Sequence, residues 1–260
     1  MRNATDLCLL SLGFLLTLMH GCGEVRVPDP AVRFVAFGDS STKGPAQRDY
    51  PDILRELIDA QPEAFANEGH GGESAREGLQ RLKDLLARRL YPNAHTLLYW
   101  QGGIDILDFI RRTDPLVALS PTSPDYPFQE ALNEALEATQ ANIEAAIMAA
   151  REAGWTVYVA TYYLPPEAVL PCEPLVVDVI LPEQAARAGA YIRLLNERIR
   201  RAADNAGATL VDVERSASSL SADVLNFHNC NHLSARGNTA VAEVFRAALQ
   251  GSATQPGEPG

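Results

Sequence analysis

The chain has 260 residues and carries 22 Lys and Arg against 33 Asp and Glu, so its formal net charge at pH 7 is −11. Hydrophobic residues make up 47% and charged residues 21%, a balance typical of globular proteins that excludes collagen-like and largely disordered classes. The acidic charge and the absence of a Lys/Arg cluster from the sequence argue against nucleic-acid partners and polyanionic substrates.

The first 21 residues have the pattern of an export signal. The apolar run from Leu7 to Met19 is too short for a membrane span, which needs roughly 20 residues, but fits the core of a signal peptide. Cys22 follows a glycine directly after this run, which resembles the lipobox of bacterial lipoproteins. The resemblance implies that residues 1–21 are removed, that Cys22 is lipidated, and that the protein is exported to the periplasm or outer cell envelope and lipid-anchored. Met19 and Asp6 depart from the pattern, so an ordinary secretory signal or an N-terminal anchor is the alternative.

Strand and helix patterns alternate through the remaining sequence. Apolar runs bounded by turn residues predict strands at 32–38, 64–69, 95–100, 155–162 and 209–213. Amphipathic or Ala-rich stretches predict helices at 51–60, 73–89, 129–153, 183–206 and 234–249. We expect a linker at 22–31, one domain at 32–249 with a Pro-rich segment at 164–182, and a disordered tail at 250–260.

This alternation predicts an α/β fold. Right-handed crossovers between successive strands give a three-layer α/β/α sandwich around a central, five-stranded parallel sheet. In such sheets the functional groups lie at the carboxyl ends of the strands. Residues that directly follow the predicted strands are therefore the first candidates for a site.

Four such segments carry groups suited to chemistry. Ser40 follows the first strand, in Gly-Asp-Ser, and Gly72 lies in a Gly-rich loop after the second. The third strand is followed by Gly-Gly-Ile-Asp at 102–105, and His232 precedes the last helix. Taken singly, a Gly-Asp-Ser sequence is most often a turn or helix cap, and a lone histidine is most often a surface residue. Their order along the chain is more specific than any one of them.

In this order the four segments resemble the SGNH hydrolases, also called GDSL esterases and lipases, over residues 32–249. The resemblance implies the flavodoxin-like SGNH fold and a serine esterase without cofactor or metal. It implies that Ser40 is the nucleophile, that His232 is the general base, and that the amide N–H groups of Ser40 and Gly72 stabilise an oxyanion. The neighbouring residues expected at the substrate are Asp39, Gly103, Ile104 and Asp105.

Two residues depart from the family pattern. Ile104 stands where the family has an Asn whose side chain donates to the oxyanion, and loss of one such donor costs on the order of 10²–10³ in kcat. Asn229 stands where the family has an Asp that orients the histidine; the same change in another serine triad lowers kcat ~10⁴-fold. Asp223 reaching His232, or Gln101 serving the oxyanion, would compensate.

Two cysteines remain beside Cys22 once the signal is removed. An oxidising compartment favours a disulfide between Cys172 and Cys230; two buried free thiols are the alternative. The bond would hold the Pro-rich segment against the loop of His232 as a partial lid.

Together these features predict an exported serine esterase. Its substrates would be small acyl esters, lysophospholipid-like lipids or O-acetyl groups, and transfer to an acceptor other than water stays open. The alternative is a catalytically degenerate SGNH-fold protein that acts as a binding or assembly module of the envelope, favoured by Ile104 and Asn229 but opposed by the retained Ser40 and His232. A nucleotide-binding protein would need a Gly-rich phosphate loop after the first strand, and residues 37–41 do not form one.

Overall fold

The computed structural model describes residues 26–172, 175 and 177–253. The predicted signal peptide, the lipidation site Cys22 and residues 254–260 of the predicted tail lie outside this part.

Five parallel strands form the central sheet, which confirms the predicted fold class. They run in the order β2-β1-β3-β4-β7. Their bounds are β1 Phe34–Gly38, β2 Phe65–Gly69, β3 Thr96–Trp100, β4 Thr156–Ala160 and β7 Thr209–Val211. The chain reverses its progress across the sheet at β1, which pairs with β2 on one side and β3 on the other. The carboxyl ends of β1 and β3 therefore flank the switch point at which open α/β sheets bind ligands.

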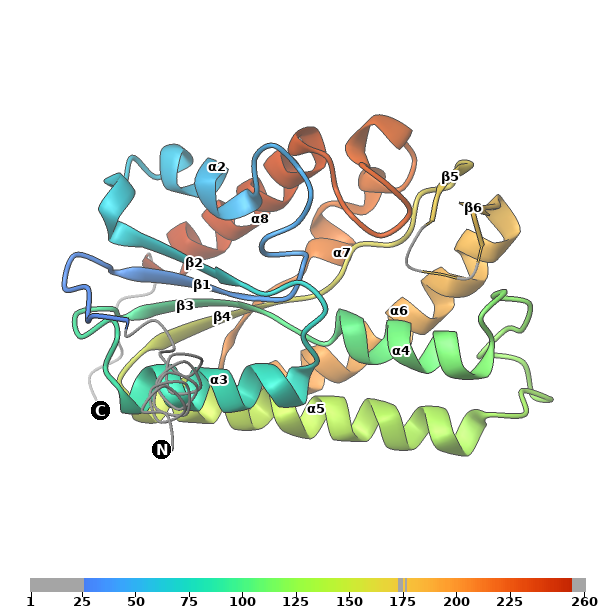
Figure 1. The fold of residues 1–260 in the computed structure, drawn as a ribbon, viewed down its shortest axis with the longest axis horizontal. Helices are drawn as coiled ribbons and strands as arrows, with labels where there is room; N and C mark the ends of the chain where they lie inside the picture. The colour runs from blue at the N-terminus through green and yellow to red at the C-terminus, as the bar shows by residue number, and fades with distance from the viewer. Residues whose placement is uncertain (1–25, 173–174, 176, 254–260) are drawn as a thin grey trace, which may run out of the picture.

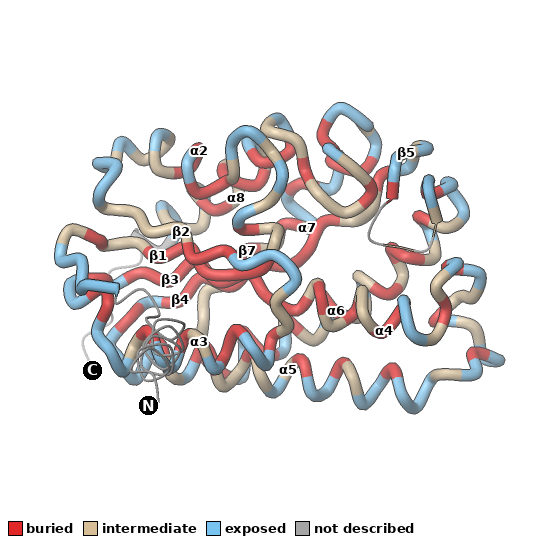
Figure 2. The backbone as a smooth tube through the Cα atoms, viewed as in Figure 1, coloured by how far each residue is buried: buried red, intermediate tan, exposed pale blue. Residues whose placement is uncertain are grey.

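Helices cover both faces of this sheet (Figure 1). On one face α2 (Tyr50–Leu57) packs against α8 (Ala235–Ala253). On the other, α5 (Gln129–Glu152) lies between α3 (Ala75–Ala87) and α6 (Pro182–Ala206) and contacts both. The strands between the two layers are largely buried (Figure 2). The molecule is thus a three-layer α/β/α sandwich.

Local sequence sets where helices begin and end. The hydroxyl of Ser74 accepts from the Glu77 amide, and the Glu77 carboxylate accepts from the Ser74 amide, a capping box that starts α3. Helix α6 ends at Gly207, whose φ of 66° is a left-handed conformation that glycine adopts without strain. The last helix continues to Ala253, past the residue 249 expected from the sequence.

Several elements were not predicted. Helix α4 (Gly103–Thr113) starts three residues after the end of β3, in a stretch where the sequence analysis predicted no helix. The Pro-rich segment contains a short antiparallel hairpin of β5 (Leu170–Pro171) and β6 (Val179–Ile180). The predicted fifth strand is shorter than expected, because α7 (Val213–Ser216) begins at its last residue. Short 3-10 helices cover Pro62–Ala64, Ser218–Leu220 and Val224–Asn226. Within the described residues, none of the helices has the length and apolar character needed to cross a membrane.

A disulfide joins Cys172 and Cys230, as the sequence predicts. It links residues 58 positions apart, with their Cα atoms 5.0 Å from each other. The amide of Cys230 also donates to the carbonyl of Pro171, at 2.9 Å. The hairpin segment is thereby fixed to the loop that carries His232.

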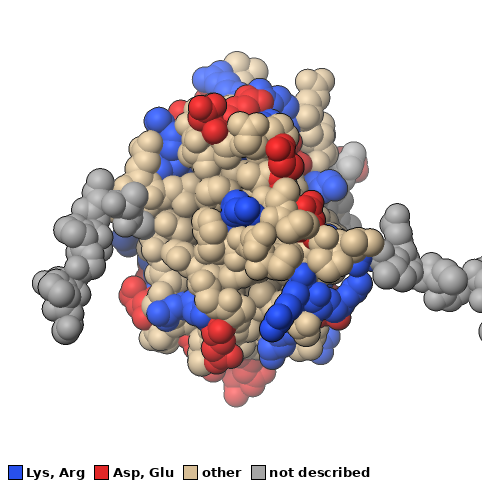
Figure 3. Space-filling view, turned by 90° about the vertical axis from the view of Figure 1, so that its left-hand side faces the viewer, with Lys and Arg blue, Asp and Glu red and all other residues tan. Residues whose placement is uncertain are grey.

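The candidate segments follow the carboxyl ends of the strands. The opposite end of the molecule, shown in Figure 3, carries both acidic and basic side chains among uncharged ones.

Candidate active site

Three side chains from two loops form a hydrogen-bonded row at the carboxyl edge of the sheet. Nε2 of His232 lies 3.0 Å from Oγ of Ser40, and Nδ1 of His232 lies 3.0 Å from Oδ1 of Asn229. Ser40 stands two residues after β1, and the other two residues stand in the loop before α8. A serine hydroxyl bonded to an imidazole, itself oriented by a third group, is the arrangement that activates a nucleophile.

Backbone donors fix the orientation of the Asn229 amide. The amide N–H groups of Asn231 and His232 donate to its Oδ1, at 3.2 and 2.9 Å. Only the oxygen of the side chain can accept these bonds, so Asn229 presents oxygen and not NH₂ to the imidazole. Nδ1 of His232 therefore carries the proton, and Nε2 faces Ser40 as an acceptor. That is the tautomer a general base needs.

The imidazole of His232 is held neutral. Burial, together with a smaller effect of repulsion from His228, lowers its pKa to about 4. Its orienting partner is an uncharged amide, so no charge on that partner stabilises the imidazolium.

Neither substitute considered from the sequence compensates for the two departures. Asp223 forms an ion pair with Arg236, at 2.7 Å, instead of reaching His232. Gln101 is fully buried and donates its Nε2 to Glu73, at 2.6 Å. Sequence spacing alone did not reveal these competing partners.

Two amide N–H groups, one in the Ser40 turn and one in the Gly-rich loop, are unused. In the described part of the chain, the amides of Ser40 and Gly72 donate to no other residue. The Gly-rich loop passes close to the serine, since a Cβ on Gly71 would lie 3.8 Å from the Ser40 Cβ. A bond from the His70 amide to the carbonyl of Gly38, at 2.8 Å, anchors this loop to β1. Free N–H groups in these positions are suited to stabilise an oxyanion.

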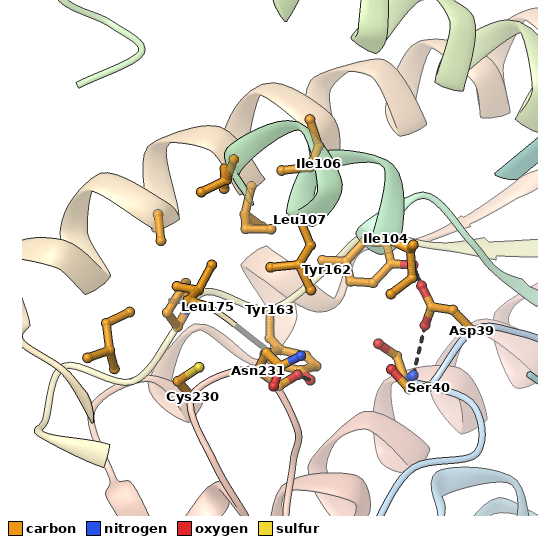
Figure 4. Close-up of a pocket in the computed structure, with 17 residues that line it drawn as sticks. Asp39, Ser40, Ile104, Ile106, Leu107, Tyr162, Tyr163, Leu175, Cys230 and Asn231 are labelled. Atoms are coloured by element: carbon orange, nitrogen blue, oxygen red, sulfur yellow. Dashed lines mark hydrogen bonds between the residues drawn. The ribbon is translucent and has the colours of Figure 1, made fainter. Parts of the chain in front are cut away.

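The segment after β3 divides into two parts. Gly103 and Ile104 line a cavity beside Ser40 (Figure 4), and the Ile104 side chain offers no hydrogen-bond donor there. Asp105 is not among the residues that line this cavity. Its carboxylate accepts from the Ala75 amide, at 2.8 Å, and so ties the start of α3 to α4.

Asp39 is a buried carboxyl beside the serine. It accepts from the hydroxyl of Tyr162, at 2.6 Å, and from the amide of Ser41, at 2.8 Å. These partners are a phenol and an amide, not a cation. Burial raises the pKa of Asp39 to about 6, and the two hydrogen bonds oppose that rise.

Two tyrosines complete the site, although the sequence analysis did not single them out. Tyr162 bonds to Asp39, and the hydroxyl of Tyr163 donates to the carbonyl of Asn231, at 2.7 Å. Both follow β4, at the same edge of the sheet as Ser40. Two consecutive aromatic residues at the carboxyl end of a strand were the available signal.

An apolar cavity and a smaller recess both include Ser40 in their walls. The cavity has a volume of about 100 Å³ and is bounded mostly by apolar side chains (Figure 4). The recess, of about 10 Å³, includes Ser40, Asp49, His232 and Asn238. This is close to the space that one water molecule needs. Among the described residues, no three His, Cys, Asp or Glu side chains are grouped so that they could hold a metal ion.

Comparison with known proteins agrees with this geometry. A model of the GDSL-like lipase/acylhydrolase family matches residues 36–240. No curated protein sequence matches the chain.

Solved structures share the fold. A lipolytic G-D-S-L family protein from Veillonella parvula is 16% identical, with 86% of this chain and 100% of that chain covered and a TM-score of 0.56. The psychrotrophic esterase EstA from Pseudoalteromonas is 14% identical, with 86% and 99% covered and a TM-score of 0.55. The acetyl xylan esterase AlAXEase is 18% identical, with 84% and 100% covered and a TM-score of 0.57.

The raised pKa of Asp39 predicts a pH-dependent loss of stability. The folded protein holds the Asp39 proton more tightly than the unfolded chain, so stability is lost as the pH rises from about 4 through about 6. The Asp39→Asn variant has no such ionisation. Its free energy of unfolding, relative to wild type, should increase by about 2 kcal/mol between pH 4 and pH 8. Urea unfolding at both pH values measures this change, with the exposed Asp125→Asn as control. A difference between Asp39→Asn and wild type that is the same at both pH values would refute it.

Proposed function

Because the chain belongs to the GDSL-like lipase/acylhydrolase family, we propose that it hydrolyses carboxylic esters through an acyl-enzyme on Ser40. The observation that carries this proposal is the row in which His232 lies within 3.0 Å of both Ser40 and Asn229. Small acyl esters, lysophospholipid-like lipids and O-acetyl groups all suit this chemistry.

Each residue of the row has a role in the proposed reaction. Oγ of Ser40 attacks the acyl carbon while Nε2 of His232 takes the hydroxyl proton and then delivers it to the leaving alcohol. The free amides of Ser40 and Gly72 stabilise the oxyanion. Water then attacks the acyl-enzyme, with His232 again as the base. Gly103 and Ile104 contact the substrate, whereas Asp39 and Asp105 position the loops around it.

We expect turnover by this mechanism to be slow compared with an enzyme that has a side-chain oxyanion donor and a carboxylate beside the histidine. Ile104 supplies no oxyanion donor, and Asn229 supplies no charge to the imidazolium. The same two residues favour a second candidate function, that of an envelope binding or assembly module which keeps the fold without the reaction.

We further propose that the protein is exported and lipid-anchored. The disulfide between Cys172 and Cys230 supports export, because such bonds persist in oxidising compartments. Cys22, after a signal peptide at 1–21, is the proposed lipidation site.

If Cys22 carries the lipid, incorporation of radioactive fatty acid should depend on Cys22 alone. When the full chain is expressed in a bacterial host fed radioactive palmitate, the wild type should become labelled and sediment with the membranes. The Cys22→Ala variant should lose the label, and Cys8→Ala, which changes a cysteine within the signal, should keep it. A Cys22→Ala protein that is still labelled would contradict the assignment.

Ser40→Ala decides between the esterase and the binding module. We expect it to lower kcat/KM for p-nitrophenyl esters by about 10³ or more, because no other group replaces the nucleophile. A fluorophosphonate should label the wild type but not the variant. The exposed Ser219→Ala serves as the matched control. Background-level hydrolysis by the wild type together with no labelling would favour the binding module.

Asn229→Asp should shift the pH profile. A carboxylate at Nδ1 stabilises the imidazolium, so it raises the pKa of His232 from about 4 toward its ordinary value. Since the base must be neutral, the acid limb of kcat/KM moves to higher pH. We expect kcat to rise about tenfold to a hundredfold, less than the ~10⁴ known for another triad, because the required tautomer already exists. The exposed Asn133→Asp adds the same charge away from the site. An unmoved acid limb in Asn229→Asp would count against His232 as the base.

A further inference from the structure

The cavity beside Ser40 is built for an uncharged chain. Its walls come from α4, from α6 and from the segment after β4, with Ile104, Leu107, Ile110, Ala188 and Ile192 among them. No Lys, Arg or His lines it among the described residues, and its only carboxyl is Asp39. An anionic group would find no cation there, whereas an apolar chain gains by leaving water.

The position of the histidine decides which half of the ester the cavity takes. In the proposed reaction, the oxygen of the leaving alcohol must come within hydrogen-bond reach of His232 Nε2. His232 lines the small polar recess but not the apolar cavity. The alcohol therefore lies on the side of the recess, and the acyl group lies on the side of the cavity.

One end of the cavity is linked to the disulfide. Figure 4 shows Leu175 and Cys230 at the end away from Asp39 and Ser40. Leu107 lies between these two ends. Ile180 of β6 also lines this cavity and is buried. The disulfide to Cys172 joins Cys230 to the hairpin segment, which limits how far the two can separate at this end of the cavity.

We propose that this cavity binds the acyl chain, that the preferred substrates carry an apolar acyl group longer than acetyl, and that Ala188 helps to set the chain length accepted. The inference rests on the proposed ester hydrolysis. With about 100 Å³ of space, and about 10–15 Å³ needed for one water-sized group, the cavity holds several carbon atoms beyond the acyl carbon. Ala188 is a small, buried residue of its α6 wall, so a larger side chain there shortens the space.

Acyl-length profiles of the full protein test this. The wild type should show a higher kcat/KM for p-nitrophenyl hexanoate than for the acetate, since each buried methylene is worth about fourfold. Ala188→Leu should lower the hexanoate-to-acetate ratio by about tenfold or more. Ala186→Leu makes the same change at an exposed position of the same helix and should keep the wild-type ratio. Should Ala188→Leu fail to fold, Ile192→Ala enlarges the cavity instead and should raise the octanoate-to-hexanoate ratio about fourfold.

A binding measurement separates this inference from the proposed reaction. Calorimetric titration of the Ser40→Ala protein with N-butylhexanamide, which is not hydrolysed, should show tighter binding than with N-butylacetamide. Adding Ala188→Leu should remove the difference, and adding Ala186→Leu should not. If the wild type binds the hexanamide but does not hydrolyse esters, the proposed ester hydrolysis is overturned and the cavity assignment stands. A wild type that hydrolyses acetate, with an acyl-length ratio that neither cavity variant changes, would overturn the cavity assignment alone.

Discussion

The site depends on how closely the chain turns at the end of β1. Gly38 lies between Gly69 of β2 and Trp100 of β3 in the sheet register. A Cβ on Gly38 would stand 2.2 Å from the Trp100 carbonyl oxygen, and one on Gly69 would stand 2.5 Å from Lys43. Glycine is therefore required at both strand ends. Only this close approach lets the turn that carries Ser40 fold back against the sheet between the two neighbouring strands.

A buried polar network ties that turn to the far layer of the molecule. The side chain of Asn196 on α6 binds both the amide and the carbonyl of Tyr162, each at 2.7 Å, and also Glu214, which pairs with Arg200. The Tyr162 hydroxyl in turn holds Asp39, next to Ser40. Because each of these bonds satisfies a group that would be costly to bury alone, the network fixes one geometry of the turn.

The sequence predicted what depends on periodicity, on the order of segments and on cysteine pairing, and it missed several contacts between polar side chains of separate segments. Five apolar runs gave the sheet, and the order of the candidate segments gave the family. Helix α4 was missed, because Gly102 and Gly103 resemble a turn when their neighbours in space are unknown. Asp223 pairs with Arg236, Gln101 bonds to Glu73, and Tyr162 bonds to Asp39. In each case the two residues come from separate segments of the chain. Spacing along the chain does not encode such contacts.

The neutral Asn229 is consistent with the charge that the site already holds. Asp39 is buried beside Ser40 with only hydrogen bonds to oppose the desolvation of its carboxylate. An Asp at position 229 would add a second carboxylate to this partly buried region, with a counter-ion only while His232 is protonated. The amide keeps the directional part of the interaction, since its oxygen still sets the tautomer, and gives up the electrostatic part. Orientation and charge, which a carboxylate supplies together, are thus separated in the interaction between Asn229 and His232.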